Sequence, residues 1–219
     1  MHILYGCPFA RSALVESVLL ELDLPYKLID VDIHNNQQNE RDYLAINPVG
    51  LIPTLITPSG ERLTETLAIC LFLSEQHSEA GLIPASNSPL RGKFLSQLFF
   101  ISNDLDSRAK TMFYPHRWST DSEDANRIQK KAVADLKESW QIVNRRLEQE
   151  GPYGLGEKLS LLDIAMSLWV AYGLEYPSEI NDLFPAVDVV YKSVCEMPGA
   201  GKPILRIRDL EEQYRAEQV

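Results

Sequence analysis

Three side chains able to supply a nucleophile, or to stabilise one, lie close together near the N-terminus of this 219-residue chain. They are Tyr5, Cys7 and Ser12, all within the segment LYGCPFARS at positions 4–12. Cys7 begins a spacing like that of C-x-x-C, but the fourth position is Ala10, so a dithiol mechanism cannot operate. Any chemistry of this segment therefore uses a single hydroxyl or a single thiol.

Two further segments combine turn residues with groups that can bind a polar ligand. Residues 47–55, NPVGLIPTL, lead a loop into a strand through Pro53, and residues 63–69, LTETLAI, place Glu65 and Thr66 at the start of a helix. A helix N-terminus favours an anion through its dipole and its unpaired N–H groups. Since Glu65 can accept from an ammonium group, this turn can recognise a zwitterion.

The elements that must position these groups follow from hydropathy patterns. Over residues 1–77 there are four strand-like runs, two helical stretches, and a polar segment at 34–48 that holds at most a short helix. The strands are predicted at 2–5, 26–31, 51–57 and 61–65, and the helices at about 9–22 and 64–77. The first strand, helix and strand imply parallel pairing, and the Pro-Ser-Gly turn at 58–60 implies an antiparallel pair. This order predicts an α/β thioredoxin-like domain.

A change of composition separates a second domain. Residues 79–89 are rich in Gly, Pro, Ala, Ser and Asn, which is typical of a linker. Amphipathic helical stretches follow it at about 90–113, 122–150, 160–173, 184–196 and from 204 onward. We therefore predict a thioredoxin-like domain over 1–78 and an all-α helical bundle over 90–219.

The overall charge narrows the possible partners. The formal net charge is −10 and no run of five Lys or Arg occurs, so we expect no nucleic-acid or anionic-membrane binding. No stretch reaches the roughly 18 apolar residues of a membrane span. The N-terminus lacks the basic region of a secretory signal, and we expect a cytoplasmic protein. Three cysteines and four scattered histidines have no metal-ligand spacing, and we expect no metal.

Taken in order, these segments resemble the cytosolic glutathione transferase superfamily over essentially the whole chain. LTETLAI is similar to the family's E-S-x-A-I segment, and in the family the second proline of a segment like NPVGLIP is cis. Residues 160–165, SLLDIA, resemble the capping box of the family's helical bundle, with Ser160 as the cap and Asp163 bonding back. The resemblance implies glutathione as co-substrate, a small hydrophobic electrophile as second substrate, and a homodimer.

The resemblance also implies contacts for glutathione in the first domain. Ile52, held by Pro53, would offer its N–H and C=O to the cysteinyl part. Glu65 would accept from the γ-glutamyl ammonium, and Thr66 would bind the neighbouring carboxylate together with the N–H groups of its helix.

Further expected contacts lie around the thiol and in the second domain. The backbone N–H groups of Phe9 and Ala10 are candidate donors to the sulfur, and Asp104 could reach the γ-glutamyl amine across a dimer interface. The segment FYPHRW at 113–118 places rings and a cation at a proline break, and Tyr114 and Arg117 are expected to face the electrophile. The alternative for this segment is an aromatic packing cluster at a helix kink.

Three residues remain candidates for activating the thiol. A free thiol titrates near ~8.5, so the site must favour the thiolate through a donor and a positive field. PFARS aligns with the P-G-x-C-S of bacterial beta-class enzymes, which favours Ser12 and places Arg11 at their cysteine. The segment CPFA is similar to the omega-class motif, which favours Cys7, and the tyrosine-type classes favour Tyr5.

Three functions follow from these alternatives. The leading one is conjugation of glutathione to an electrophilic carbon. The second is a glutathione-dependent disulfide or peroxide reductase that works through Cys7. The third is a binding protein that keeps the fold without turnover, because fold alone does not decide function.

Overall fold

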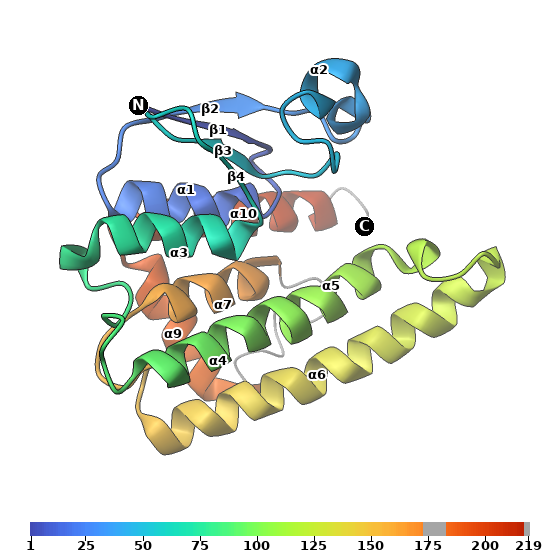
Figure 1. Ribbon diagram of the computed structural model, residues 1–219. Helices are drawn as coiled ribbons and strands as arrows, with labels where there is room; N and C mark the ends of the chain where they lie inside the picture. The colour runs from blue at the N-terminus through green and yellow to red at the C-terminus, as the bar shows by residue number, and fades with distance from the viewer. Residues whose placement is uncertain (173–182, 217–219) are drawn as a thin grey trace.

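The computed structural model describes residues 1–172 and 183–216 of the chain. Its N-terminal part is a four-stranded sheet with helices, and its C-terminal part is a set of long helices, as Figure 1 shows. The predicted helix at 160–173 ends one residue beyond the described range, and the predicted helical domain also includes 173–182 and 217–219, which lie outside it.

The sheet has the strand order β2-β1-β3-β4. β1 pairs in parallel with β2 and antiparallel with β3, and β3 pairs antiparallel with β4. The four strands are β1 (His2–Gly6), β2 (Tyr26–Asp30), β3 (Thr54–Ile56) and β4 (Arg62–Thr64). This confirms the predicted thioredoxin-like topology.

Helices connect the strands and cover the sheet. α1 (Ser12–Glu21) and α3 (Thr66–Gln76) lie together between the sheet and the helical part (Figure 1). The predicted short helix of the polar segment is α2 (Arg41–Leu44), which follows a 3₁₀ turn, η1 (Gln37–Asn39). α1 begins three residues later than predicted, because residues 9–11 form a turn ahead of the helix.

The second part contains the predicted helical stretches, with two differences. The elements are α4 (Arg91–Phe100), η3 (Ile101–Leu105), α5 (Asp106–Phe113), α6 (Ala125–Glu150), α7 (Leu161–Tyr172), α9 (Pro185–Cys195) and α10 (Gly201–Ala216). The first difference is that the stretch 90–113 contains a π-helical turn, η3. The second is that α10 begins at Gly201 and buries Ile204 and Ile207, so its first turns are apolar on one side.

Two helices form the centre of the molecule. All residues of α1 from Ser12 to Leu19 are buried, because this helix packs on the sheet side and also contacts α3, α7 and α10. α7 is almost wholly buried as well. The predicted capping contact is present in the first turn of α7. The Asp163 carboxylate accepts from the Ser160 N–H at 2.8 Å and from the Gly154 N–H at 2.7 Å.

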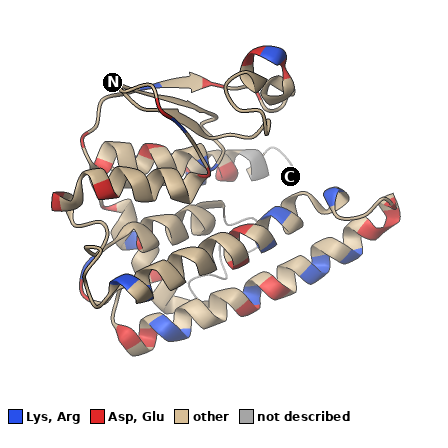
Figure 2. Cartoon of the chain, viewed as in Figure 1, with Lys and Arg blue, Asp and Glu red and all other residues tan. Residues whose placement is uncertain are grey.

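α6 shows the opposite pattern, with one buried face. Its buried positions recur every three or four residues, as expected for an amphipathic helix. They are Ala132, Leu136, Ser139, Trp140, Val143, Asn144 and Leu147. Figure 2 shows charged residues of both signs along this helix. α4, η3 and α5 lie between α6 and the first domain, and they pack against α6 and α7.

Candidate active site

The loop before β3 is held firmly in place. The Leu51 carbonyl accepts from the Tyr43 hydroxyl at 2.7 Å and from the Asn47 side-chain amide at 2.7 Å. The Ile52–Pro53 peptide bond is cis, as the resemblance implies. These contacts leave Ile52 at the edge of the sheet with a fixed backbone.

Glu65 lies beside this loop at the N-terminal end of α3. Its backbone has φ +66°, in the left-handed region that a residue with a side chain seldom adopts. Such conformations concentrate at ligand sites because the surrounding structure must hold them. Thr66 follows as the first residue of α3 and is buried. Arg11, Ile52, Pro53, Glu65 and Thr66 all line one small groove.

A larger cavity of about 530 Å³ adjoins this groove. It shares Arg11, Glu65 and Thr66 with the groove and extends to the helical part. Its helical wall consists of residues from α4, η3, α5 and α7: Leu98, Phe99, Ile101, Ser102, Asn103, Asp106, Ser107, Lys110, Ala165, Leu168 and Trp169. The two spaces together offer a polar end and a partly apolar end, with Arg11 between them.

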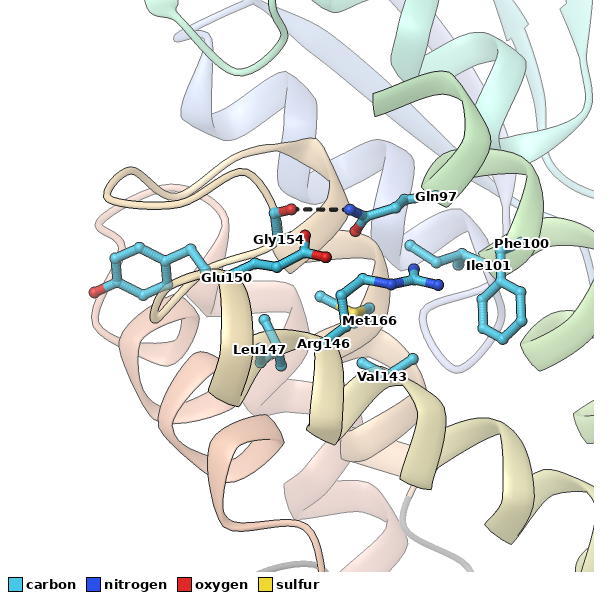
Figure 3. A pocket seen from close by; sticks show the side chains of 10 residues that line it. Gln97, Phe100, Ile101, Val143, Arg146, Leu147, Glu150, Gly154 and Met166 are labelled. Carbon is cyan, nitrogen blue, oxygen red and sulfur yellow. Dashed lines mark hydrogen bonds between the residues drawn. The ribbon is translucent and has the colours of Figure 1, made fainter. Parts of the chain in front are cut away.

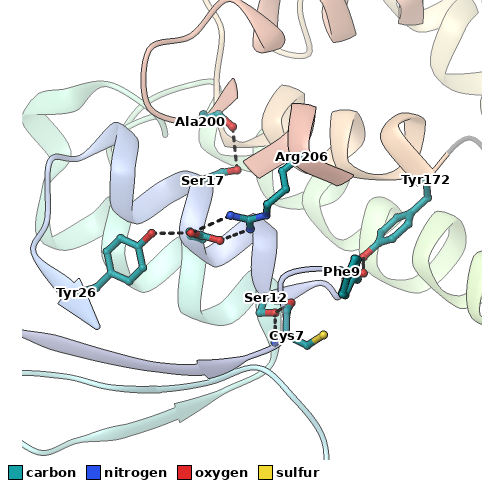
Figure 4. Close-up of polar contacts among 9 residues, drawn as sticks. Cys7, Phe9, Ser12, Ser17, Tyr26, Tyr172, Ala200 and Arg206 are labelled. Atoms are coloured by element: carbon teal, nitrogen blue, oxygen red, sulfur yellow. Dashed lines mark hydrogen bonds and ion pairs between the residues drawn. The ribbon is translucent and has the colours of Figure 1, made fainter. Parts of the chain in front are cut away.

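The Ser12 hydroxyl is occupied by the backbone of its own loop. It donates to the Cys7 carbonyl at 2.6 Å and accepts from the Cys7 N–H at 2.9 Å, and the residue is only 1 % exposed (Figure 4). A Cβ on Gly6 would lie 2.4 Å from the Ser12 Cβ, so the serine is also tightly packed. These bonds fix the shape of the loop, and the expectation that the hydroxyl faces the glutathione thiol stays a prediction.

Cys7 is buried, and its role as a nucleophile stays a prediction. The thiol is 5 % exposed, and burial raises its pKa although the Phe9 N–H favours the thiolate. A raised pKa leaves less thiolate at neutral pH. Tyr5 lies in β1, where its ring packs edge-on against the Tyr43 ring at 6.2 Å between centroids.

Arg11 is the cationic group that the sequence interpretation did not assign to the site. Its Nη1 donates to both carboxylate oxygens of Asp106 in α5, at 3.1 and 3.0 Å. Arg11 directly precedes α1, where the Ala13 and Leu14 N–H groups donate to the Ala10 and Arg11 carbonyls at 2.9 and 3.1 Å, so this helix end offers its dipole rather than these donors. The positive side chain and this helix end lie on the same cavity edge. The sequence signal was a basic residue in an active-site turn, but its partner is 95 positions away.

Phe9 and Ala10, whose backbone N–H groups were predicted to donate to the sulfur, have different backbone contacts. The Ala10 N–H already donates to the Cys7 carbonyl at 3.0 Å. The Phe9 carbonyl accepts from the Tyr172 hydroxyl of α7 at 2.6 Å, so a residue of the second domain holds this turn (Figure 4). Sequence reasoning did not find Tyr172, because only the fold brings it near Phe9.

The residues predicted for the second substrate are stacked beside the site. The Arg117 guanidinium lies 4.2 Å from the centre of the Tyr114 ring. Phe113 connects this pair to Tyr172, with ring centres 6.0 Å apart, and Tyr172 connects to Trp169 at 5.5 Å. Trp169 lines the large cavity, whereas Tyr114 and Arg117 are not among the described residues that line it. Their role stays a prediction.

Asp104 belongs to the turn η3 but bonds within the helical bundle. Its carboxylate accepts from the Ser139 hydroxyl at 2.6 Å and pairs with Arg108 at 2.8 Å. The neighbouring Asn103 and Ser102 line the large cavity instead. The predicted role of Asp104 across a dimer interface stays a prediction.

A separate cavity lies at the far end of α4. Its volume of about 10 Å³ has room for at most about one water molecule. Figure 3 shows its side chains, among which the Gln97 amide donates to the Gly154 carbonyl at 3.1 Å. This space is too small for a substrate.

Two kinds of feature are absent from residues 1–172 and 183–216. No helix in those ranges is long and apolar enough to cross a membrane. They also contain no group of three or more His, Cys, Asp or Glu that could hold a metal ion.

The N-terminal part of the chain matches a known protein family. The family described as "Glutathione S-transferase, N-terminal domain" matches residues 1–81.

Three relatives from Escherichia coli match most of the chain. An uncharacterized GST-like protein of strain K12, YncG, is 27 % identical over 195 residues, which cover 89 % of this chain and 92 % of the relative. The glutathione S-transferase GstA of O157:H7 is 29 % identical over 162 residues, 73 % of this chain and 76 % of the relative. The disulfide-bond oxidoreductase YfcG of strain K12 is 27 % identical over 210 residues, 93 % and 94 %.

A solved structure has the same fold. It is a glutathione transferase homolog from Sulfitobacter with bound glutathione, with a TM-score of 0.81 and 22 % identity over 98 % of each chain.

Proposed function

Because the chain belongs to the cytosolic glutathione transferase superfamily, we propose that it is an enzyme that joins the glutathione thiolate to a small hydrophobic electrophile. The single observation that carries this proposal is the continuity of the two spaces at Arg11, Glu65 and Thr66. The Glu65 and Thr66 side of the groove suits the zwitterionic end of a peptide, and the larger cavity suits an apolar partner beside it. The expected homodimer and cytoplasmic location remain predictions.

Glutathione fits the groove through the groups already described. Glu65 accepts from the γ-glutamyl ammonium, and the N-terminal N–H groups of α3, with Thr66, bind the α-carboxylate. The Ile52 backbone pairs with the cysteinyl part. This arrangement directs the thiol toward the turn that precedes α1.

The chemical step needs the thiolate next to the electrophile. We assign stabilisation of the thiolate to the Arg11 guanidinium and to the positive end of the α1 dipole, since a positive field lowers a thiol pKa. Ser12 acts through the Cys7 peptide and is a positioning residue. The sulfur attacks the electrophilic carbon, the leaving group departs with its electron pair, and the thiol proton passes to solvent.

A second candidate is reduction of disulfides by the glutathione thiolate itself. The similarity to YfcG, a disulfide-bond oxidoreductase, over 93 % of this chain supports it. The buried Cys7 with its raised pKa argues against the predicted version that works through that cysteine. In the version that this similarity supports, the glutathione thiolate attacks the disulfide, and the protein only holds and activates glutathione.

Glutathione binding and turnover test the proposal together. Purified protein is titrated with glutathione by calorimetry and assayed with 1-chloro-2,4-dinitrobenzene beside bis(2-hydroxyethyl) disulfide. Glu65→Gln should weaken glutathione binding at least about tenfold, because it removes the charge opposite the ammonium. Glu61→Gln is the matched control, an exposed acid in the same turn region. Equal binding by both variants, or no binding by the wild type, would contradict the proposed site.

A further inference from the structure

The large cavity carries an imbalance of charge on its helical side. Arg11 and Lys110 both pair with Asp106: Arg11 Nη1 at 3.0 Å and Lys110 Nζ at 2.7 Å from the same oxygen, Oδ2. All three residues line the cavity. Among the described residues on this helical side of the cavity, one carboxylate therefore faces two cations, an excess of about one positive charge before any ligand binds.

The other acid of the cavity does not remove this excess. Glu65 lies at the end shared with the glutathione groove, where the proposed function pairs it with the ligand's ammonium. Arg11 serves the thiolate at the junction. Lys110 contacts the same Asp106 oxygen as Arg11, and its side chain is 41 % exposed, so a ligand and solvent can reach it.

An apolar surface lies beside this charge. Leu98, Ile101, Leu168 and Trp169 line the same cavity, and Phe99 is 60 % exposed. A molecule that fills this space can place an apolar body on these side chains and direct an anion toward Lys110. The excess of cations also contrasts with the net charge of −10 for the whole chain.

From this arrangement we infer that the second substrate carries a carboxylate on an apolar, electrophilic body, and that Lys110 selects it. The inference rests on the proposed function and names its substrate class. Asp106 is a positioning residue here, because it holds both cations and lowers their net charge. The reaction is unchanged: for an aryl chloride a C–S bond forms, the C–Cl bond breaks, chloride leaves, and the thiol proton goes to the buffer.

A matched substrate pair tests the preference. 1-chloro-2,4-dinitrobenzene is neutral, and 4-chloro-3,5-dinitrobenzoate carries a carboxylate on the same kind of ring. The value of kcat/KM for each is divided by its rate without enzyme, and the readout is the ratio of carboxylated to neutral substrate. In wild type we expect a ratio above about ten that falls as salt rises. Lys110→Gln should lower the ratio about tenfold, and Asp106→Asn should raise it.

Two controls make the result specific. Lys93→Gln removes an ammonium of α4 that pairs with Glu150 of α6 and is not among the described residues that line the cavity, so it should leave the ratio unchanged. The opposite signs for Lys110→Gln and Asp106→Asn separate a charge effect from general damage, and circular dichroism checks the fold of each variant. A ratio that is the same in wild type and Lys110→Gln overturns the inference.

Calorimetry with the two conjugates separates this inference from the proposed function. S-(2,4-dinitrophenyl)glutathione and its ring-carboxylated counterpart are titrated into the wild-type protein. Equal dissociation constants overturn the inference and leave the proposed function in place. Tighter binding of the carboxylated conjugate without turnover of either chloride supports the inference and removes the proposed conjugation activity. No binding of either conjugate overturns both.

Discussion

Arg11 lies in the first domain of the sequence, but its guanidinium contacts Asp106 of the second domain. Its bond to Asp106 uses a single nitrogen of a group that has five N–H donors. The fixed planar geometry of the group suits a site that must hold an anion at one place. The role assigned to Arg11 therefore depends on its charge as well as its position.

Arg11→Gln tests that role. Loss of the cation should raise the pKa of bound glutathione, because less positive charge stabilises the thiolate. The acid limb of the pH profile of kcat/KM should then move up by about one unit, and activity at pH 7 should fall roughly tenfold. Arg91→Gln, which removes a guanidinium paired with Glu75 outside the cleft, is the control. An unmoved acid limb in Arg11→Gln would refute the assignment.

Cys7 should behave as a structural thiol. Because burial raises its pKa, the thiolate fraction is small at neutral pH and increases as the pH rises. We expect alkylation of Cys7 by iodoacetamide in the native protein to be at least about tenfold slower at pH 7 than in the urea-unfolded chain, and to quicken toward pH 10. Mass spectrometry of the Cys7 peptide measures the rate.

Activity provides the second test of Cys7. Cys7→Ser should retain most of the conjugation and disulfide-reduction activity, because the mechanism uses the thiol of glutathione. Disulfide reduction that disappears in Cys7→Ser, together with rapid alkylation at pH 7, would restore the omega-like mechanism.

Ser12, which the sequence favoured, and its neighbour Arg11 have different contacts in the structure. A serine and an arginine that are adjacent before a helix point in different directions, and their spacing does not indicate which side chain reaches a cavity. Ser12 turns inward to the Cys7 peptide, while Arg11 reaches across to α5. The partner of Arg11, Asp106, is 95 positions away in the sequence, so local sequence patterns do not indicate this contact.

Among the elements, those with strong periodicity were predicted well. The four strands, the parallel first pair, the antiparallel last pair, the covering helices and the capping contact before α7 follow from local hydropathy, turn residues and capping. The π turn η3 was not foreseen, because one wider turn leaves the apolar spacing of residues 90–113 almost unchanged. Such turns are frequent at functional sites. Here the turn and the start of α5 present Ser102, Asn103 and Asp106 to the cavity.

The contact between α7 and the turn before α1 carries a prediction of its own. Tyr172→Phe removes the hydroxyl that donates to the Phe9 carbonyl but keeps the ring between Phe113 and Trp169. The turn should become less fixed, so kcat should fall about three- to tenfold while the Kd for glutathione changes little, because the ammonium and carboxylate contacts remain. Stopped-flow rates and calorimetry measure the two quantities.

A matched variant controls for the lost hydroxyl. Tyr153→Phe removes a tyrosine hydroxyl whose partner is Ser193, at 3.4 Å, away from both cavities' polar groups. It should leave kcat unchanged. If Tyr172→Phe has the same kcat as the wild type, the hydroxyl does not position the turn.

At the scale of the whole molecule, polar bonds join α1 to α10 through a buried interface. The Glu16 carboxylate, 7 % exposed, accepts from Tyr26 at 2.7 Å and pairs with Arg206 of α10 (Figure 4). The Ser17 hydroxyl donates to the Ala200 carbonyl at 2.9 Å, just before α10. The last described helix is thereby attached to the helix that begins at the active site.

Removal of the buried cation should destabilise both parts at once. Arg206→Met leaves the Glu16 carboxylate without its positive partner, and breaking such a pair costs about 3 kcal/mol. Urea unfolding should show a lower midpoint in a single transition followed by both tryptophan fluorescence and circular dichroism. Arg208→Met, which breaks an exposed pair with Asp209, should change stability by less than about 1 kcal/mol. Similar losses in the two variants would show that the buried pair contributes nothing specific.

The burial of α1 on every side has a consequence for how such proteins can diversify. Residues Ser12–Leu19 contact the sheet, α7 and α10, so this helix has no solvent-facing surface along most of its length. A thioredoxin-like half taken from one relative and a helical half from another would meet at mismatched side chains in a close-packed interior. Recombination at the linker should therefore yield working hybrids only when the inner faces of α1, α7 and α10 are inherited together.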